Sequence, residues 1–329
     1  MTSLADRLPW GRLPEPSTRT LRRLAVASLV SQVGIVLTGG AVRLTGSGLG
    51  CPTFPRCTED SLVNTPEYGW HGYVEFGNRL LTFVLGAIAL ATLLAVLRTL
   101  RGSRPRRDLV PLATVLLLGI PAQALIGGVT VLTQLNPWVV MLHFMCSAVL
   151  IGLATALVRR VDEPAIGPAV AVGSPWLRRL SGVVLVVAYL TVYAGTVVTG
   201  TGPHAGDPDS PRTGLDLEAV TQVHADLVFL LLGTTVGLLF AARALGSPGR
   251  TARAAGVLLG VELAQGLIGY TQVFLGVPVL LVGLHMLGAS LLVVAAVDAW
   301  LATRTFRPVV ADRAEVVTGV GIPAARVEA

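Results

Sequence analysis

The sequence predicts an all-α polytopic membrane protein with eight transmembrane helices, on three observations. Hydrophobic residues make up 53% of the 329 residues and charged residues only 13%, and the mean hydropathy is +0.70, unlike a soluble domain. Eight apolar runs are each long enough to cross a hydrocarbon core about 30 Å thick. The second half of the chain repeats the pattern of the first. Helices are expected because lipid cannot hydrogen-bond to the backbone.

The first four spans are separated by loops of distinct composition. A tail with proline and arginine precedes the first span, and a long loop containing TGSGLGCPTFPRC follows it. A strongly basic loop, RTLRGSRPRRD, separates the second span from the third, and a short turn at 134–137 leads to the fourth. The expected spans are 24–42, 74–96, 109–132 and 138–158.

The last four spans follow a linker rich in arginine and proline. The loop TGTGPHAGDPDSPRTGLD joins the fifth span to the sixth, RALGSPGRTAR joins the sixth to the seventh, and a tight turn at 276–278 leads to the eighth. The expected spans are 180–198, 217–241, 254–274 and 279–302. The chain thus divides into a tail (1–20), a four-helix bundle (21–160), a linker (161–179), a second four-helix bundle (180–303) and a polar tail (304–329), expected to be disordered from Thr303.

Arginine placement predicts the orientation in the membrane. All 25 basic residues are arginine, and 21 of them lie on the tails, the linker or the loops after the second and sixth spans. Because positively charged loops stay in the cytoplasm, both termini are expected there, in a plasma membrane. The net charge of +6 therefore orients the protein, and no nucleic-acid partner is expected. The other side carries only Arg43, Arg56, Arg79 and Arg212.

One segment of the third and fourth spans occurs twice. QALIGGVTVLTQLNPWVVMLH (123–143) returns as QGLIGYTQVFLGVPVLLVGLH (265–285), and TGSG after the first span returns as TGTG after the fifth. Because the repeated unit holds four spans, the two bundles should have the same orientation and be related by a pseudo-twofold axis along the membrane normal. Matched positions include Gln123/Gln265, Gly127/Gly269 and His143/His285.

Three histidines lie within the expected spans, where a histidine is costly and usually functional. His143 and His285 lie near the outer ends of the fourth and eighth spans, and His224 lies at a comparable depth in the sixth. Two histidines on facing helices can supply both axial ligands of a haem between them, so His224 and His285 form a candidate pair. The alternative for any single histidine is a hydrogen-bonded polar residue inside a bundle.

The first half breaks this symmetry, because Asn78 occupies the position that corresponds to His224, and asparagine is a poor iron ligand. Glu75 lies one turn before Asn78 on the same helix face. Arg79 follows Glu75 by four residues and can pair with it or bind an acidic group of a ligand. Two interpretations of Glu75 stay open: a structural ion pair, and a catalytic carboxylate beside a cofactor.

The outer loops hold two cysteines and two further histidines. Cys51 and Cys57 bracket CPTFPRC, and the oxidising outer side favours a disulfide over a metal site. His71 and His204 are interpreted as solvated surface residues, although His71 approaches the first site if the second helix begins early. The acids Asp226, Glu262 and Asp298 are assigned either to interhelical hydrogen bonding or to a proton path.

On these motifs the chain resembles the haem A synthase family of the cytochrome oxidase assembly pathway, over about residues 20–305, and the arginine-only composition fits the actinobacterial branch best. The resemblance rests on the eight spans and on several motifs that are weak alone and specific together. They are GGAVRLTGSGLGCPTFPRC, VEFGNRLLT, ALIGG followed by LH, the VH of the sixth span, and GLIGYTQV followed by GLH.

The resemblance implies a membrane oxidoreductase that converts the C8 methyl of haem O into the formyl of haem A, with oxygen from water. It implies a haem b cofactor between His224 and His285. It also implies a substrate site in the first half, with His143 on the substrate haem iron, Glu75 as the catalytic acid and a redox-active outer cysteine pair. A haem O synthase, a membrane electron acceptor and the lipid bilayer are the expected partners.

The chain departs from the family pattern at one position, since the usual histidine three residues after the acid is Asn78 here. We therefore expect His143 to be the single strong ligand of the substrate iron, with Glu75 and Asn78 on the opposite face of the macrocycle. The alternatives are that His71 replaces the missing ligand or that the site needs none. Arg79 and Arg43 are the nearest candidates for binding the haem propionates.

Two functions of other classes compete with this hypothesis. A non-enzymatic di-haem electron carrier would need ligands near the inner surface as well, and the candidate ligands all cluster on the outer side. A transporter would need paired broken helices at the midplane of the membrane, which the spans lack.

Overall fold

The computed structural model describes residues 15–102, 105–163, 169–171, 174–246 and 249–306. In this part of the chain, eight helices are long and apolar enough to cross a membrane, which confirms the predicted all-α membrane fold. The helices are α1 (Thr18–Leu44), α2 (Gly69–Thr99), α3 (Val110–Leu132), α4 (Pro137–Val161), α5 (Pro175–Thr201), α6 (Leu217–Ala244), α7 (Gly249–Phe274) and α8 (Val279–Ala302).

Four short elements flank these helices. The 3₁₀ turns η3 (Pro66–Tyr68) and η4 (Arg107–Leu109) lead into α2 and α3, and β1 (Ala169–Ala171) pairs antiparallel with β2 (Arg304–Phe306). The expectation of disorder from Thr303 onward is therefore wrong for the first residues of the tail, whose backbone groups pair with the linker. The remaining tail residues lie outside the described part of the chain.

Polar residues cap the start of some helices, and at α1 the cap places the start before the apolar run. Before α1, Ser17 Oγ accepts a hydrogen bond from the Thr20 N–H at 3.1 Å, which caps the helix ahead of the first apolar residue. Before α6, Asp216 caps in the same way. The helix α2 begins at Gly69, several residues earlier than expected, and this early start brings His71 onto the helix.

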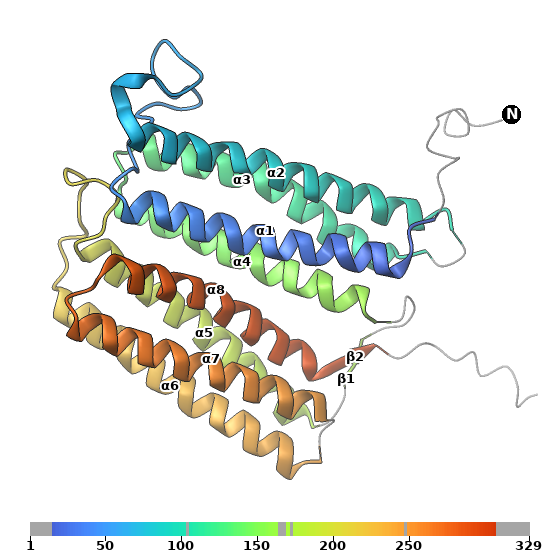
Figure 1. The fold of residues 1–329 in the computed structure, drawn as a ribbon. Coiled ribbons are helices and arrows are strands. Elements are labelled where there is room, and N and C mark those ends of the chain that lie inside the picture. The colour runs from blue at the N-terminus through green and yellow to red at the C-terminus, as the bar shows by residue number, and fades with distance from the viewer. Residues whose placement is uncertain (1–14, 103–104, 164–168, 172–173, 247–248, 307–329) are drawn as a thin grey trace, which may run out of the picture.

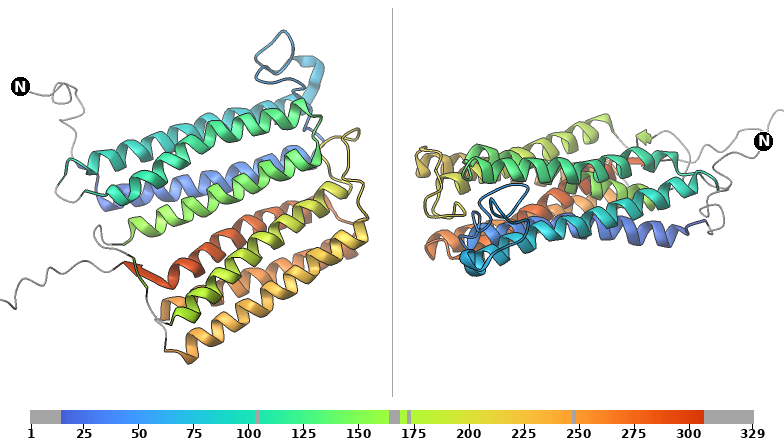
Figure 2. Two further views of the ribbon diagram at one scale, coloured as in Figure 1. Left: turned by 180° about the vertical axis from the view of Figure 1, so that it is seen from behind. Right: turned by 90° about the horizontal axis from the view of Figure 1, so that it is seen from above.

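The eight helices pack as two groups of four (Figure 1). Helices α1 to α4 form a ring in which each contacts the next and α4 returns to α1, and α5 to α8 do the same. Consequently α2 lies diagonally across from α4, and α6 across from α8. The groups meet where α4 contacts α5 and α8 and where α1 contacts α8; Figure 2 shows this side-by-side arrangement from behind. The order of neighbours is the same in both groups, while the twofold axis itself stays a prediction.

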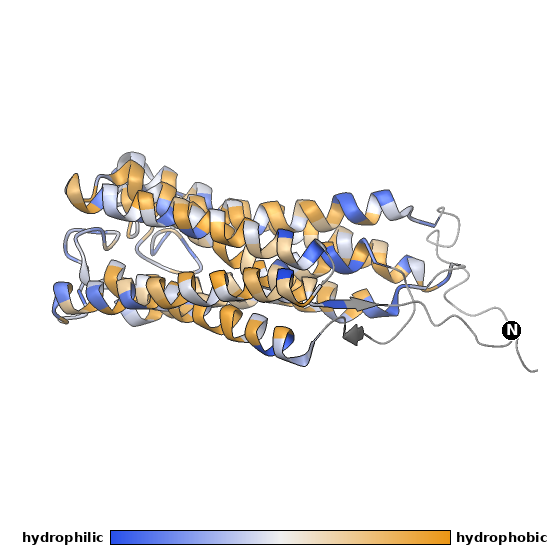
Figure 3. Cartoon of the chain, turned by 90° about the horizontal axis from the view of Figure 1, so that it is seen from below, coloured by the Kyte–Doolittle hydropathy of each residue, from blue (hydrophilic) through white to orange (hydrophobic). Residues whose placement is uncertain are grey.

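The two ends of the bundles differ in chemistry. Apolar residues dominate the middle of every helix and polar residues gather at the ends (Figure 3). We call one end the disulfide end, because the loop with Cys51 and Cys57 lies there. We call the other the arginine end, because it holds ion pairs such as Arg22–Asp162 and Arg106–Asp108.

Two helices of the second group, α6 and α7, have buried residues only in their arginine halves. The buried residues of α6 all lie between Leu231 and Ala242, and those of α7 between Thr251 and Glu262. The remaining residues of both helices, toward the disulfide end, are half-buried or exposed. In this half of the group, α6 and α7 therefore contribute little to the buried core.

The contact between the two groups generates a prediction. Tyr189 of α5 donates a hydrogen bond from its hydroxyl to the Ala148 carbonyl of α4 at 3.2 Å. Tyr189→Phe should therefore lower the free energy of unfolding by about 0.5–1.5 kcal/mol, measured by denaturant titration in detergent. Tyr193→Phe, on an exposed tyrosine of the same helix, is the matched control. Equal effects of the two substitutions would contradict the assigned contact.

Candidate functional site

Two histidines of the second group lie near each other on diagonal helices. His224 lies on α6 and His285 on α8, and their rings are close enough to interact electrostatically. His224 Nδ1 lies 3.1 Å from the Thr191 carbonyl of α5. A carbonyl only accepts, so Nδ1 carries the proton and Nε2 is left as a lone-pair donor. A backbone carbonyl that fixes the tautomer in this way is typical of a metal-ligating histidine.

Each of the three intramembrane histidines packs against a glycine on a neighbouring helix. A Cβ atom added to Gly195 of α5 would lie 3.1 Å from His224 Cε1. A Cβ at Gly127 of α3 would lie 3.2 Å from His143 Cε1, and one at Gly269 of α7 would lie 3.5 Å from His285 Cε1. The missing side chains let the imidazoles lie flat against the helix backbones. Gly127 and Gly269 are shared by the sequence repeat, but sequence reasoning assigned them no role.

His143 and His285 also leave a polar atom without a partner. The Nδ1 atoms of both rings are buried and make no hydrogen bond to described residues. An unpaired buried polar atom is costly, and in a membrane interior water cannot relieve that cost.

These residues fit a planar haem group in the second half. Imidazoles on two diagonal helices are a donor set that can bind haem iron, and His285 Nδ1 is a buried polar atom without a partner among the described residues. Among the described residues, no cluster of three or more His, Cys, Asp or Glu side chains could hold a metal ion without a macrocycle.

Polar side chains hold the backbone of α4 at His143 in the first half. Gln123 of α3 donates from Nε2 to the His143 carbonyl at 3.1 Å and to Ser147 Oγ at 2.5 Å. The hydrogen bonds tie α3 to α4 at the level of the histidine. Gln265, its repeat partner, instead packs against Gly288 of α8.

Asn78 and His71 have partners of their own on the helix face that also carries Glu75. Asn78 Oδ1 accepts a hydrogen bond from Thr38 Oγ1 of α1 at 2.8 Å. His71 is half-buried in the first turn of α2, and its Nδ1 lies 2.9 Å from Ser47 Oγ. No hydrogen bond within the described residues joins Asn78 or His71 to His143.

The interpretation of His71 and His204 as solvated surface residues is wrong. His71 is half-buried because α2 begins early. His204 is also half-buried, and its Nε2 lies 3.0 Å from the Val277 carbonyl in the turn before α8. The His204 carbonyl in turn accepts a hydrogen bond from Arg43 at 2.5 Å. Arg43 therefore fastens the disulfide-end loops of the second half onto α1.

Glu75 and Arg79 form an ion pair that holds the disulfide loop on α2. The Glu75 carboxylate accepts from Arg79 Nη2 at 2.5 Å and from the Cys51 N–H at 2.7 Å, and it is buried. Arg79 also donates to the carbonyls of Cys51, Thr53 and Arg56 at 2.8–3.1 Å. This structural ion pair was one of the two predicted interpretations, and it does not exclude a catalytic role.

The disulfide loop covers the first group of helices. Cys51 and Cys57 form the predicted disulfide, and both are fully buried. Phe54, between them, packs on Gly128 of α3, where a Cβ atom would approach within 2.5 Å of its ring. Gly128 directly follows Gly127, the glycine beneath His143, so the loop lies next to the histidine. Sequence reasoning missed Phe54; only its place inside CPTFPRC marked it.

The three remaining acids have different environments. Asp226 is exposed and bonds only to Gln222, one turn earlier on α6. Asp298 pairs with Arg159 at the arginine end. Glu262 is buried on α7, where one carboxylate oxygen accepts from Thr235 at 2.7 Å and the other has no partner. Of the three, Glu262 alone lies inside a bundle with a free oxygen.

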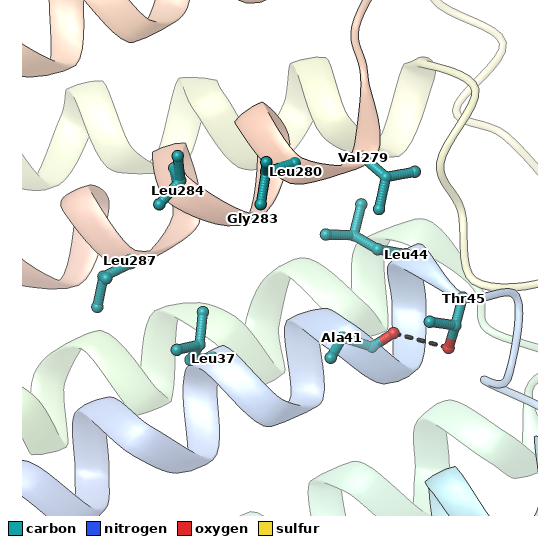
Figure 4. Close-up of a pocket in the computed structure, with 9 residues that line it drawn as sticks. All are labelled: Leu37, Ala41, Leu44, Thr45, Val279, Leu280, Gly283, Leu284 and Leu287. Atoms are coloured by element: carbon teal, nitrogen blue, oxygen red, sulfur yellow. Dashed lines mark hydrogen bonds between the residues drawn. The ribbon is translucent and has the colours of Figure 1, made fainter.

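An apolar groove lies between the two groups at the disulfide end. Its volume is about 260 Å³, and leucines of α1 and α8 form most of its wall (Figure 4). Thr45 turns its hydroxyl to the Ala41 carbonyl at 2.8 Å, so even this polar residue offers no free donor. The groove suits hydrocarbon and contains none of the candidate ligands.

Comparison with known proteins identifies relatives over most of the chain. A sequence model of the cytochrome oxidase assembly protein family matches residues 22–297. A heme A synthase of Lysinibacillus sphaericus is 32% identical over 59% of this chain and 62% of its own length. Heme A synthases of Geobacillus thermodenitrificans and Bacillus cereus are each 27% identical, over 59% and 63% of this chain. The chain spans 60–66% of the length of these relatives.

The ion pair of Glu75 and Arg79, which holds the disulfide loop on α2, generates a second prediction. Arg79→Gln removes charge-assisted hydrogen bonds worth about 1.5–3 kcal/mol each, so the loop should open more often. The Cys51–Cys57 disulfide should then be reduced at least roughly tenfold faster by a water-soluble phosphine, followed by thiol labelling and mass spectrometry. Arg212→Gln, whose guanidinium bonds within the other loop, is the control. An unchanged reduction rate in Arg79→Gln would rule out the role of Arg79 in holding the loop.

Proposed function

Because the chain belongs to the cytochrome oxidase assembly protein family, we propose that it is a membrane oxidoreductase of haem A biosynthesis. Its proposed reaction converts the C8 methyl of haem O into the formyl of haem A, removing electrons and protons and adding an oxygen atom from water. The observation that carries this proposal is the difference between the two histidine sites. The second half has His224 and His285 on its diagonal helices α6 and α8, whereas the first half has His143 on α4 and a buried carboxylate, Glu75, on the diagonal helix α2.

In this proposal the second half holds a resident haem b. His224 and His285 bind its iron from diagonal helices, with Thr191 fixing the tautomer of His224. When bound, this group supplies one-electron transfer. The protein's own contribution is to hold two neutral imidazoles in place and to exclude water. If both histidines held the iron, no position would be left for a substrate, so this site would suit electron transfer to a membrane acceptor.

The first half is the proposed substrate site. His143 binds the iron of haem O, and Gln123 and Ser147 hold the backbone of that turn. The side-chain oxygen of Asn78 accepts a hydrogen bond from Thr38. Asn78 therefore leaves open the face of the macrocycle opposite His143. Glu75 is oriented by Arg79 and by the Cys51 N–H, and its remaining lone pairs can accept a proton from the attacking water.

We place the disulfide end outside the cell and the arginine end in the cytoplasm. The support is the positive-inside rule together with the disulfide, which needs an oxidising compartment. Both termini are then cytoplasmic. The proposed partners are haem O, a haem O synthase that delivers it and a membrane electron acceptor.

The reaction itself can be tested by haem analysis. Membranes that contain the protein and a source of haem O should yield a haem with the mass of the formyl product. His143→Ala should lower that yield by roughly a hundredfold or more, because the substrate loses its fixed position. His204→Ala is the matched control in an outer loop. If the unchanged protein binds haem and yields neither hydroxylated nor formylated product, the chain is instead a non-enzymatic di-haem electron carrier.

The resident cofactor has its own test. His285→Ala and His224→Ala should each abolish the low-spin absorption spectrum of a bis-histidine haem in the purified protein. Glu75→Gln should leave that spectrum intact while it lowers product formation. A full low-spin spectrum in His285→Ala would contradict the proposed cofactor site.

A further inference from the structure

A second cavity lies at the arginine end, far from the histidines. Its volume is about 620 Å³, and α4, α7 and α8 surround it. On α4 its wall includes Arg159, roughly 24 Å along the helix from His143 at 1.5 Å per residue. The proposed haem chemistry gives this cavity no role. Its lining residues are Arg159, Gly249, Arg250, Arg253, Ala254, Val257 and Asp298.

The cavity has more positive charge than the protein neutralises. Asp298 pairs with Arg159, and Arg250 Nη1 reaches Glu163 at 3.4 Å. Arg250 Nε is buried and has no partner among the described residues. Arg253 is exposed and makes no ion pair or hydrogen bond with any described residue. At least one buried and one exposed guanidinium donor are therefore free for a ligand.

The shape of the cavity indicates a ligand with a charged head and an apolar tail. The first turn of α7 contributes its guanidiniums and Gly249, where the helix N-terminus adds partial positive charge. One turn deeper, the wall becomes apolar at Ala254 and Val257, and Val257 is 56% exposed on the membrane-facing surface. The charged part thus lies at the helix ends and the apolar part continues toward the membrane core.

From this arrangement we propose that the cavity binds the phosphate headgroup of an anionic phospholipid, with an acyl chain along α7. Planar guanidiniums match phosphate oxygens with paired hydrogen bonds. Basic pockets between helices on the arginine-rich side of a membrane are suited to such headgroups. Since α4 belongs to the first group and α7 and α8 to the second, the bound lipid joins the two halves at the end opposite the haem sites.

The proposal is tested on the full-length purified protein by thermal unfolding in nanodiscs of phosphatidylcholine, with and without phosphatidylglycerol. Phosphatidylglycerol should raise the unfolding midpoint, and Arg253→Gln should weaken its apparent affinity roughly fivefold. Arg243→Gln removes an exposed arginine at the same end, outside the cavity, and should leave the affinity unchanged. Native mass spectrometry should show retained phosphatidylglycerol in the unsubstituted protein and less in Arg253→Gln.

Three results would overturn the proposal. The first is equal stabilisation by phosphatidylcholine alone, which would mean that the charged head does not matter. The second is equal stabilisation by inorganic phosphate in detergent, which would mean that the site takes a free anion. The third is an equal loss of affinity in Arg243→Gln and Arg253→Gln, which would place the effect in the general surface charge. None of these readouts depends on haem oxidation.

Discussion

The organisation of the protein depends on one constraint, the burial of three imidazoles inside apolar helix bundles. A membrane interior supplies no water to pair with a ring nitrogen, so each nitrogen needs a partner from the protein or from a ligand. His224 has Thr191 on one nitrogen, whereas His143 and His285 keep an unpaired Nδ1. Each ring lies against a glycine of a neighbouring helix, where a side chain would crowd it.

The two halves use this arrangement for different purposes. In the second half, His224 and His285 lie near each other on diagonal helices, and α6 and α7 have no buried residues toward the disulfide end. In the first half, no second histidine is hydrogen-bonded or packed against His143 among the described residues, and a disulfide loop lies over the bundle. Glu75 and Arg79 hold that loop. In our proposal the duplicated site has thus become one site closed by two histidines and one site with an open position.

Much of this could be predicted from the sequence, and the rest has identifiable physical reasons for escaping prediction. The spans, the repeat and the disulfide follow from local composition and spacing. The bond from the Cys51 N–H to Glu75 depends on how a loop folds back onto a helix, which spacing does not encode. The position of His71 depends on a helix start that no side-chain cap marks. The pairing of β1 with β2 joins segments from opposite ends of the second half.

The central claim is that one site is closed by two histidines and the other holds its haem by His143 alone. Electron paramagnetic resonance of the oxidised protein, loaded with haem b and haem O, tests it most directly. We expect one low-spin signal from the His224–His285 site and one high-spin signal that disappears in His143→Ala. Two low-spin signals would contradict the account, because they would mean that a second strong ligand, such as His71, completes the first site.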